Sequence, residues 1–131
     1  MPSPNLSGYA FNRTRQTLLA KRLALAATHW SRFRGLVGTP STNFGFGNGL
    51  WIVPCHGVHT FAMNFPIDVA YLDSSKVVVH VEHNLRPWRI ARISREAASV
   101  LELPARTLAS TGTQIGDAIE ITWRDSADVT A

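Results

Sequence analysis

The feature that most constrains this chain is residues 50–73, LWIVPCHGVHTFAMNFPIDVAYLD, a nearly uncharged run in the middle of the sequence. Apolar runs of about four to eight residues, bounded by Pro, Gly or Asp, are typical of buried strands. Residues 50–53, 58–63 and 67–72 fit this description. The same stretch holds the only cysteine and two of the five histidines. We therefore expect a β-rich core in which a few polar side chains are embedded.

The clearest element pair is a hairpin over residues 67–81. Residues 67–72 are an apolar strand, residues 73–76 a polar turn, and residues 77–81 an alternating strand. Because side chains of a strand alternate between its faces, this pattern predicts two sets of face-mates. One set is Val77, Val79 and Val81, and the other is Val78, His80 and Glu82.

The rest of the chain adds further strands and two short helices. Residues 9–12 and 119–123 favour strands, as does the alternation at residues 100–103, in a run that begins at Ser94 or Arg95. Residues 16–26 fit either a helix face or a strand, and we favour a strand. Thr28 fits the cap of one helix, while Pro104 and Gly112 fit the start and end of a second. The predicted fold is mainly β (β-rich α+β), a compact antiparallel barrel-like sheet of about six to seven strands with two short helices. We expect residues 1–131 to form a single domain with a core at about residues 9–123 and loose termini.

Composition narrows the function classes. The chain has 131 residues, 45% hydrophobic and 17% charged, which excludes wholesale disorder. Its net charge of +4 comes from scattered arginines, so a nucleic-acid partner is not expected. The densest group is Arg86, Arg89, Arg92 and Arg95, which we interpret as a solvated loop, with a phosphate contact as the alternative.

Cysteine usage and hydropathy bear on the compartment. A single cysteine excludes an internal disulfide and fits a reducing environment. Residues 23–27 are too short an apolar run for a signal peptide or a bilayer span, which needs about 20 residues. We expect a cytoplasmic protein with no membrane association.

Cys55, His56 and His59 resemble metal ligands or a nucleophile with its base. In an extended strand, Cys55 and His59 would lie roughly 13 Å apart, too far for a hydrogen bond or a shared zinc ion. His56 would point to the opposite face, unless Gly57 lets the backbone fold back. The favoured interpretation is therefore a buried thiol and a backbone-bonded histidine, and no metal or cofactor is predicted.

Asp68 heads an apolar strand on which its face-mates would be Ala70 and Leu72, so its carboxylate is expected to point inward. A buried carboxylate needs partners. It either accepts backbone N–H bonds and holds a loop, or acts with His59 in a functional site. Trp88, in a long polar loop, is either a packing residue or an exposed contact surface.

The order of motifs along the chain resembles one known family. The motifs are Arg34-Gly35-Leu36, Pro54-Cys55, His59-Thr60-Phe61, Met63, Pro66-Ile67-Asp68-Val69, Leu72-Asp73, Leu85-Arg86-Pro87, Val100-Leu101-Glu102-Leu103-Pro104-Ala105 and Gly116-Asp117. Together they resemble the DUF192 family, small proteins without an assigned biochemical activity, over residues 9–123. The resemblance implies a small β-rich, barrel-like domain with short helices, and no reaction, cofactor or partner. Asn64 departs from the pattern, because many relatives carry a basic residue there; if that residue binds an anion, this chain should do so less well.

Three hypotheses of function remain open. The first is a non-catalytic small-ligand-binding or accessory domain, whose partner is an unknown small molecule or protein. The second is a hydrolase that uses His59 with Asp68 or Cys55. The third is a purely structural or interaction module. The candidate ligand-binding residues are Cys55, His59, Thr60, Met63, Asn64, Asp68 and Trp88.

Overall fold

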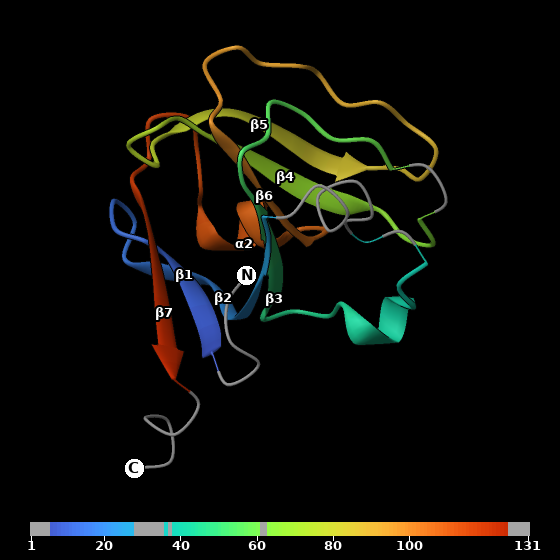
Figure 1. Cartoon of the computed structure of the whole chain (residues 1–131), viewed down its shortest axis with the longest axis horizontal. Coiled ribbons are helices and arrows are strands. Elements are labelled where there is room, and N and C mark those ends of the chain that lie inside the picture. Colours follow the sequence, from blue (N-terminus) through green and yellow to red (C-terminus); the bar gives the residue numbers. More distant parts are fainter. Residues whose placement is uncertain (1–5, 28–35, 37, 61–62, 126–131) are drawn as a thin grey trace.

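The computed structural model of the chain describes residues 6–27, 36, 38–60 and 63–125. In chain order they form β1 (Leu6–Asn12), β2 (Thr17–Ala26), the 3-10 turn η1 (Ser41–Asn43), β3 (Asn48–Ile52), β4 (Ile67–Leu72), β5 (Val78–Leu85), β6 (Ser99–Pro104), α2 (Thr107–Thr111) and β7 (Ile119–Asp125). Figure 1 shows β7, β1 and β2 on one side of the molecule and β4 and β5 on the other. The helices in this part of the chain are too short to cross a membrane.

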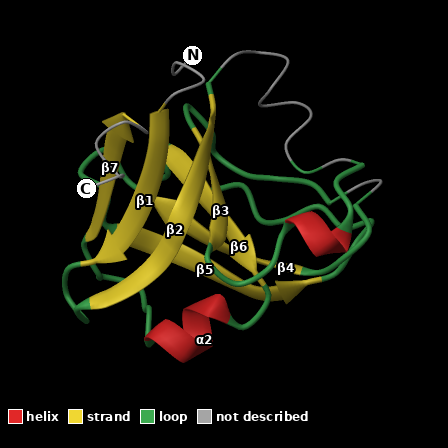
Figure 2. Ribbon diagram, turned by 90° about the horizontal axis from the view of Figure 1, so that it is seen from below, coloured by secondary structure: helices red, strands yellow, loops and turns green. Residues whose placement is uncertain are grey.

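The strands of the described chain form one seven-stranded sheet in the order β5-β4-β6-β3-β2-β1-β7. β2 and β3 run parallel, and the other neighbouring pairs are antiparallel. The sheet curls strongly (Figure 2), and Val77 forms an isolated bridge with Ala118 where its two outermost strands approach. The sheet is nevertheless not closed into a barrel. The prediction of a mainly β, mostly antiparallel fold is confirmed.

Two hydrophobic cores lie on the two faces of this curled sheet. β4 and β6 are buried along their whole length, which explains their nearly continuous apolar sequences. The inner core lies inside the curl and contains Ala10, Leu19, Ala20, Leu23, Ala70, Leu72, Val78, Leu101, Leu103, Leu108 and Ile119. The outer core lies under the long loops and contains Ala26, Leu36, Phe44, Leu50, Ile52, Met63, Phe65, Ile67, Val69, Tyr71, Ala91, Ala97 and Val100. The loops that carry the candidate site residues therefore lie on the side of the sheet that holds the outer core.

A buried polar network joins the end of β1 to the segment before β7. Asn12 donates from Nδ2 to the Thr113 hydroxyl at 3.0 Å and to the Asp117 carboxylate at 2.9 Å. The Arg15 guanidinium lies 3.1 Å from the same carboxylate. Burial acts to raise the pKa of Asp117, but hydrogen bonds from Asn12, the Gln114 backbone and Arg15 together lower this pKa below its usual value. Asp117 therefore links β1 to the segment before β7.

The hairpin at residues 67–81 is confirmed, but its predicted alternation is wrong. Val79 packs against the outer core, whereas Val81, its predicted face-mate, packs against the inner core. A register shift between Tyr71 and Leu72 of β4 places two consecutive residues of β5 on the same side, as a β-bulge does. As a result, His80 pairs with Tyr71 and lies beside its ring, with the ring centroids 4.9 Å apart.

Two other predicted elements differ from the structure, and a third falls outside the described residues. Residues 58–60 form no strand; His59 makes an isolated bridge to Ile90 instead. Pro104 is the last residue of β6, and α2 begins three residues later, although Gly112 ends it as predicted, with a left-handed φ of 70°. The helix predicted from Thr28 lies outside the described residues, as do residues 61 and 62. The described residues contain one short α-helix and one 3-10 turn, and only the second of the two expected helices falls within them.

Candidate functional site

Thr60 connects the central stretch to the loop over residues 86–92. Its side chain is fully buried, and its hydroxyl donates to the Arg86 carbonyl at 2.6 Å while accepting the Arg89 N–H at 2.8 Å. Its backbone N–H donates to the Arg89 carbonyl, and its carbonyl accepts the N–H of Trp88. This one residue thus uses hydroxyl, N–H and carbonyl to hold the loop in place.

Trp88 is exposed on that loop. Its side chain is 63% exposed, and its backbone has a φ of 63°. A left-handed conformation costs a non-glycine residue roughly 1–2 kcal/mol, so it persists where surrounding contacts impose it. Ile90 and Ile93 on the same loop are also more than two-thirds exposed, at 71% and 72%. The loop therefore projects apolar side chains into solvent from a fixed backbone.

The four arginines near this loop are all exposed, namely Arg86, Arg89, Arg92 and Arg95. Their exposure agrees with the predicted solvated loop, and the alternative of a phosphate contact stays a prediction. Together with the exposed apolar side chains, these arginines make this edge of the molecule both basic and apolar.

Asp68 lies on the opposite face of β4 from Tyr71 and is fully buried. Its Oδ1 accepts the Asn84 N–H at 2.8 Å, and its Oδ2 accepts the Leu108 N–H at 2.9 Å. The inward orientation is as predicted, although the carboxylate holds the end of β5 and the start of α2 rather than the preceding loop. Both oxygens are used by backbone donors, as the structural interpretation requires, and these contacts lend no support to a pairing with His59.

Cys55 and His56 bond to backbone carbonyls. The Cys55 thiol donates to the Gly57 carbonyl, with a sulfur–oxygen distance of 2.9 Å. His56 is exposed and its Nδ1 lies 2.6 Å from the carbonyl oxygen of Ala97. His59 is half-buried. Within the described ranges, no three His, Cys, Asp or Glu side chains are grouped so as to hold a metal ion.

Met63 and Asn64 are consecutive residues that lie in different environments. Met63 is 3% exposed and packs in the outer core. Asn64 is exposed and donates from Nδ2 to the Thr39 carbonyl at 3.3 Å. The structure therefore brings Thr60, His59 and Trp88 together at one loop junction, while Met63 and Asp68 are buried beneath it on the two sides of the sheet.

Sequence reasoning missed a polar cluster around Tyr71. The Tyr71 hydroxyl donates to the Arg92 carbonyl at 2.6 Å, and His80 lies 2.9 Å from Glu82. Burial, with smaller contributions from Glu82 and Cys55, raises the pKa of Tyr71 to about 12. Tyr71 therefore remains a hydrogen-bond donor at neutral pH and anchors the loop at Arg92. The bulge that creates this cluster is not visible in a simple alternation pattern.

Glu102 was also missed. Its side chain is 3% exposed, and Oε2 has no hydrogen-bond partner. Its strand neighbours Leu50 and Val69 both belong to the outer core. Burial raises the pKa of Glu102 to about 8. The sequence signal was a glutamate inside the strand sequence Val100–Pro104. This signal indicates a buried carboxyl group only when both faces of the strand are known to be buried.

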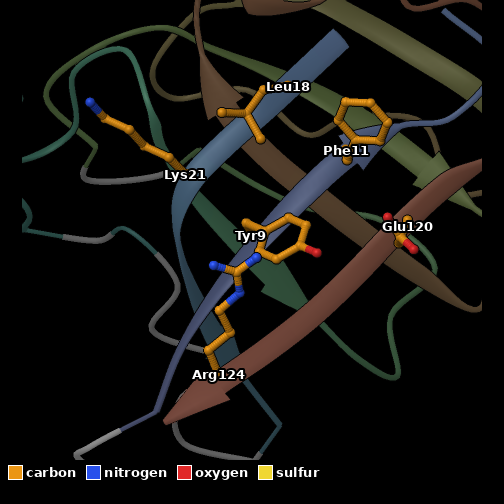
Figure 3. A pocket seen from close by; sticks show the side chains of 6 residues that line it. All are labelled: Tyr9, Phe11, Leu18, Lys21, Glu120 and Arg124. Atoms are coloured by element: carbon orange, nitrogen blue, oxygen red, sulfur yellow. The ribbon is translucent and has the colours of Figure 1, made fainter. Parts of the chain in front are cut away.

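A groove lies elsewhere, on the outer surface of β1, β2 and β7 (Figure 3). It has a volume of about 450 Å³ and is widely open to solvent. Its lining residues are Tyr9, Phe11, Leu18, Lys21, Glu120 and Arg124. None of the predicted site residues lines this groove.

The fold and the arrangement of motifs agree with a family model that matches residues 10–121, described as an uncharacterised ACR. The chain belongs to the DUF192 family. The match includes all the candidate residues from Cys55 to Trp88, and the description of the family names no activity.

Several proteins are similar to this DUF192 chain. A UPF0127 protein of Thermococcus sibiricus is 34% identical over 117 residues, which cover 86% of this chain and 72% of the relative. A UPF0127 protein of Pyrococcus abyssi is 41% identical over 63 residues, covering 48% of this chain and 53% of the relative. Both relatives are described only as UPF0127 proteins, a name that gives no activity.

Two solved structures share the DUF192 fold seen here. A protein of unknown function from Novosphingobium aromaticivorans has a TM-score of 0.74 and 19% identity, covering 87% of this chain and 83% of its own. A putative transcription regulator from Sinorhizobium meliloti has a TM-score of 0.75 and 21% identity, covering 92% of this chain and 96% of its own. At these identities the likeness concerns the fold.

Proposed function

We propose that this DUF192 domain is a non-catalytic binding domain for a small molecule, and that the ligand packs against Trp88. The observation that carries the proposal is the state of Trp88, which is exposed, left-handed and held through its backbone N–H by Thr60. The proposed contact surface is completed by His59 and Ile90, which form a backbone bridge beside it.

Pre-organisation is the physical reason for this choice. A flexible loop loses conformational entropy when it closes on a ligand, and a loop held in advance avoids most of that cost. Thr60 holds the loop at Arg86, Trp88 and Arg89, and the Tyr71 hydroxyl holds it again at Arg92. An exposed indole displayed on such a support offers a flat apolar surface, which suits a ring-bearing ligand.

The other candidate residues then have supporting roles. Asp68 fixes the end of β5 from which the loop departs, because its Oδ1 accepts the Asn84 N–H. Met63 packs in the core beneath, and Cys55 borders the Tyr71 side. The hydrolase alternative is weaker, because Asp68 is engaged by two backbone donors and the Cys55 thiol donates to the Gly57 carbonyl.

A ligand screen with matched variants tests the proposal. The wild-type chain is titrated with a panel of neutral sugars and neutral aromatic compounds, and binding is followed by calorimetry. Trp88→Ala should weaken any detected ligand at least about tenfold, the equivalent of roughly 1.4 kcal/mol. Ile115→Ala is the control, because Ile115 is similarly exposed, at 61%, on a different loop. Equal affinity of wild type and Trp88→Ala for every ligand found, or no binding across the panel, would overturn the proposal.

A further inference from the structure

The groove on β1, β2 and β7 has an apolar floor on the surface of the protein. Phe11 of β1 pairs with Leu18 of β2 and with Glu120 of β7, so these three side chains form one row across the strands. Tyr9 lies two residues from Phe11 on the same face of β1, and the close-up view shows both rings in the groove (Figure 3). The floor faces solvent, since Leu18 is 49% exposed. Two aromatic rings on adjacent same-face positions provide a stacking surface that the core does not use.

Charge is distributed unevenly around this floor. The Arg124 guanidinium carbon lies 4.9 Å from the centre of the Tyr9 ring, so a cation is stacked at that end. Lys21, also exposed, lines the groove from β2. Glu120 is opposite Phe11, at the other end of the aromatic pair. The floor therefore has the Arg124 guanidinium at one end and the Glu120 carboxylate at the other, while Lys21 extends from its β2 side, away from Tyr9 (Figure 3).

We infer that this groove binds a nucleotide, with the base on Tyr9 and Phe11 and the phosphate between Lys21 and Arg124. Glu120 accepts a hydrogen bond from the base or from a ribose hydroxyl. Stacking on an aromatic side chain tolerates any base, because every base has a flat π face. A guanidinium and an ammonium are the usual phosphate partners in proteins.

The dimensions and chemistry favour this occupant over simpler ones. The groove volume of about 450 Å³ falls within the range of small-ligand sites, about 300–1,000 Å³. A neutral sugar would leave Lys21 and Arg124 unused, and an inorganic phosphate would leave the aromatic floor unused. A nucleotide uses both, whether it is a free mononucleotide or one unit of a single strand.

Calorimetric titrations of the full chain with three related probes test the inference. Adenosine 5′-monophosphate should bind more tightly than either adenosine or ribose 5-phosphate, because adenosine lacks the phosphate and ribose 5-phosphate lacks the base. The double variant Lys21→Gln, Arg124→Gln should weaken the nucleotide at least about tenfold and leave adenosine within about twofold, because only the nucleotide has a phosphate that makes charge-assisted contacts. Tyr9→Leu should weaken adenosine and the nucleotide alike.

Arg95→Gln is the matched control, since Arg95 is exposed and lies outside the groove. The substituted cations are exposed side chains, and circular dichroism melting of each variant checks that folding is retained. Absence of binding by the wild type would overturn the inference, as would an equal loss in the Arg95→Gln control. Such failures would leave the proposed Trp88 surface untouched, because that surface is tested with neutral ligands and a different variant.

A short oligonucleotide distinguishes the two sources of the ligand. If a tetranucleotide binds more than about tenfold more tightly than the mononucleotide, with a steep dependence on salt, the occupant is a single strand. If the two bind alike, the occupant is a free nucleotide. Either result supports the inference, provided that the double variant weakens both probes; a double variant that binds both probes as wild type does would overturn it.

Discussion

Asp68 and Leu108 are 40 residues apart in the sequence, and the Asp68 Oδ2 accepts the Leu108 backbone N–H at 2.9 Å. With the bond from Asn84 to Oδ1, one buried carboxylate fixes the end of β5 and the first turn of α2. A helix of five residues has little stability of its own, so its position depends on such contacts.

Asp68→Asn should therefore destabilise the fold. The amide group of asparagine has one acceptor oxygen, so one backbone N–H would face an NH₂ donor instead of a carboxylate oxygen. We expect a loss of about 2–4 kcal/mol in the free energy of unfolding, measured by urea denaturation. Asp73→Asn is the control. A single oxygen of Asp73, Oδ1, accepts both the Ser75 and Val77 N–H groups, and asparagine keeps one such oxygen. The loss in this variant should therefore stay below about 1 kcal/mol. Equal losses in the two variants would contradict the assigned role.

Glu102 should make the fold less stable as pH rises. The unfolded chain releases this proton near pH 4.5, whereas the folded chain keeps it until about pH 8. Between these values folding takes up a proton, so the free energy of unfolding should fall by up to about 1.4 kcal/mol per pH unit. The stabilisation that Glu102 contributes is fully present below its unfolded pKa of 4.5. Urea denaturation at several pH values measures the slope.

The variant Glu102→Gln isolates this effect, since glutamine stays neutral at every pH. It should lose the downward slope and exceed the wild type in stability at pH 8–9. Glu96→Gln serves as the control, because Glu96 is exposed, and it should retain the slope of the wild type. A wild-type profile that is flat from pH 5 to pH 8 would count against a protonated Glu102.

Gly8→Ala should disrupt the packing of β1 against β7. A Cβ atom on Gly8 would lie 2.4 Å from the Trp123 ring, far inside van der Waals contact. We expect a loss of about 1–3 kcal/mol, seen as a lower melting temperature. Gly45→Ala is the control: its Cβ would meet no heavy atom within 4 Å, so stability should change by less than about 1 kcal/mol. A Gly8→Ala chain that melts at the temperature of the control would disprove this packing.

Thr60→Val should loosen the loop that carries Trp88. The hydroxyl accepts the Arg89 N–H at 2.8 Å, and valine cannot replace it. Hydrogen exchange at the Arg89 amide should accelerate by about tenfold or more. Thr60→Ser keeps the hydroxyl and should exchange nearly as slowly as the wild type. Unchanged exchange in the valine variant would mean that the loop is held by other contacts.

Local patterns identified the strands well where one chemical rule dominated. The apolar run at 67–72 and the turn at Asp73 gave the hairpin, and the position of Asp68 among Ala70 and Leu72 gave its inward orientation. The β-class followed from several such segments. These features depend on neighbours in the sequence, which is why they were predictable.

The remaining features depend on contacts between distant segments. The bulge between Tyr71 and Leu72 changes which side chains of β5 share a face, and nothing in residues 77–81 records it. Glu102 becomes notable only because its strand lies between two others, Leu50 and Val69 being its neighbours. The partners of Thr60 lie 26 to 29 residues further along the chain. Strand order and register decide these contacts, and a single sequence does not specify them.

The placement of β1 has a consequence for synthesis on the ribosome. Phe11 pairs with Leu18 in β2 and also with Glu120 in β7, which is translated more than a hundred residues later. In the hairpin of β1 and β2, the edge of β1 that pairs with β7 therefore stays unpaired until β7 has been synthesised. Such an edge invites pairing with other nascent chains. The interval before β7 arrives is thus the period in which this protein is most exposed to misassembly and would gain most from a chaperone.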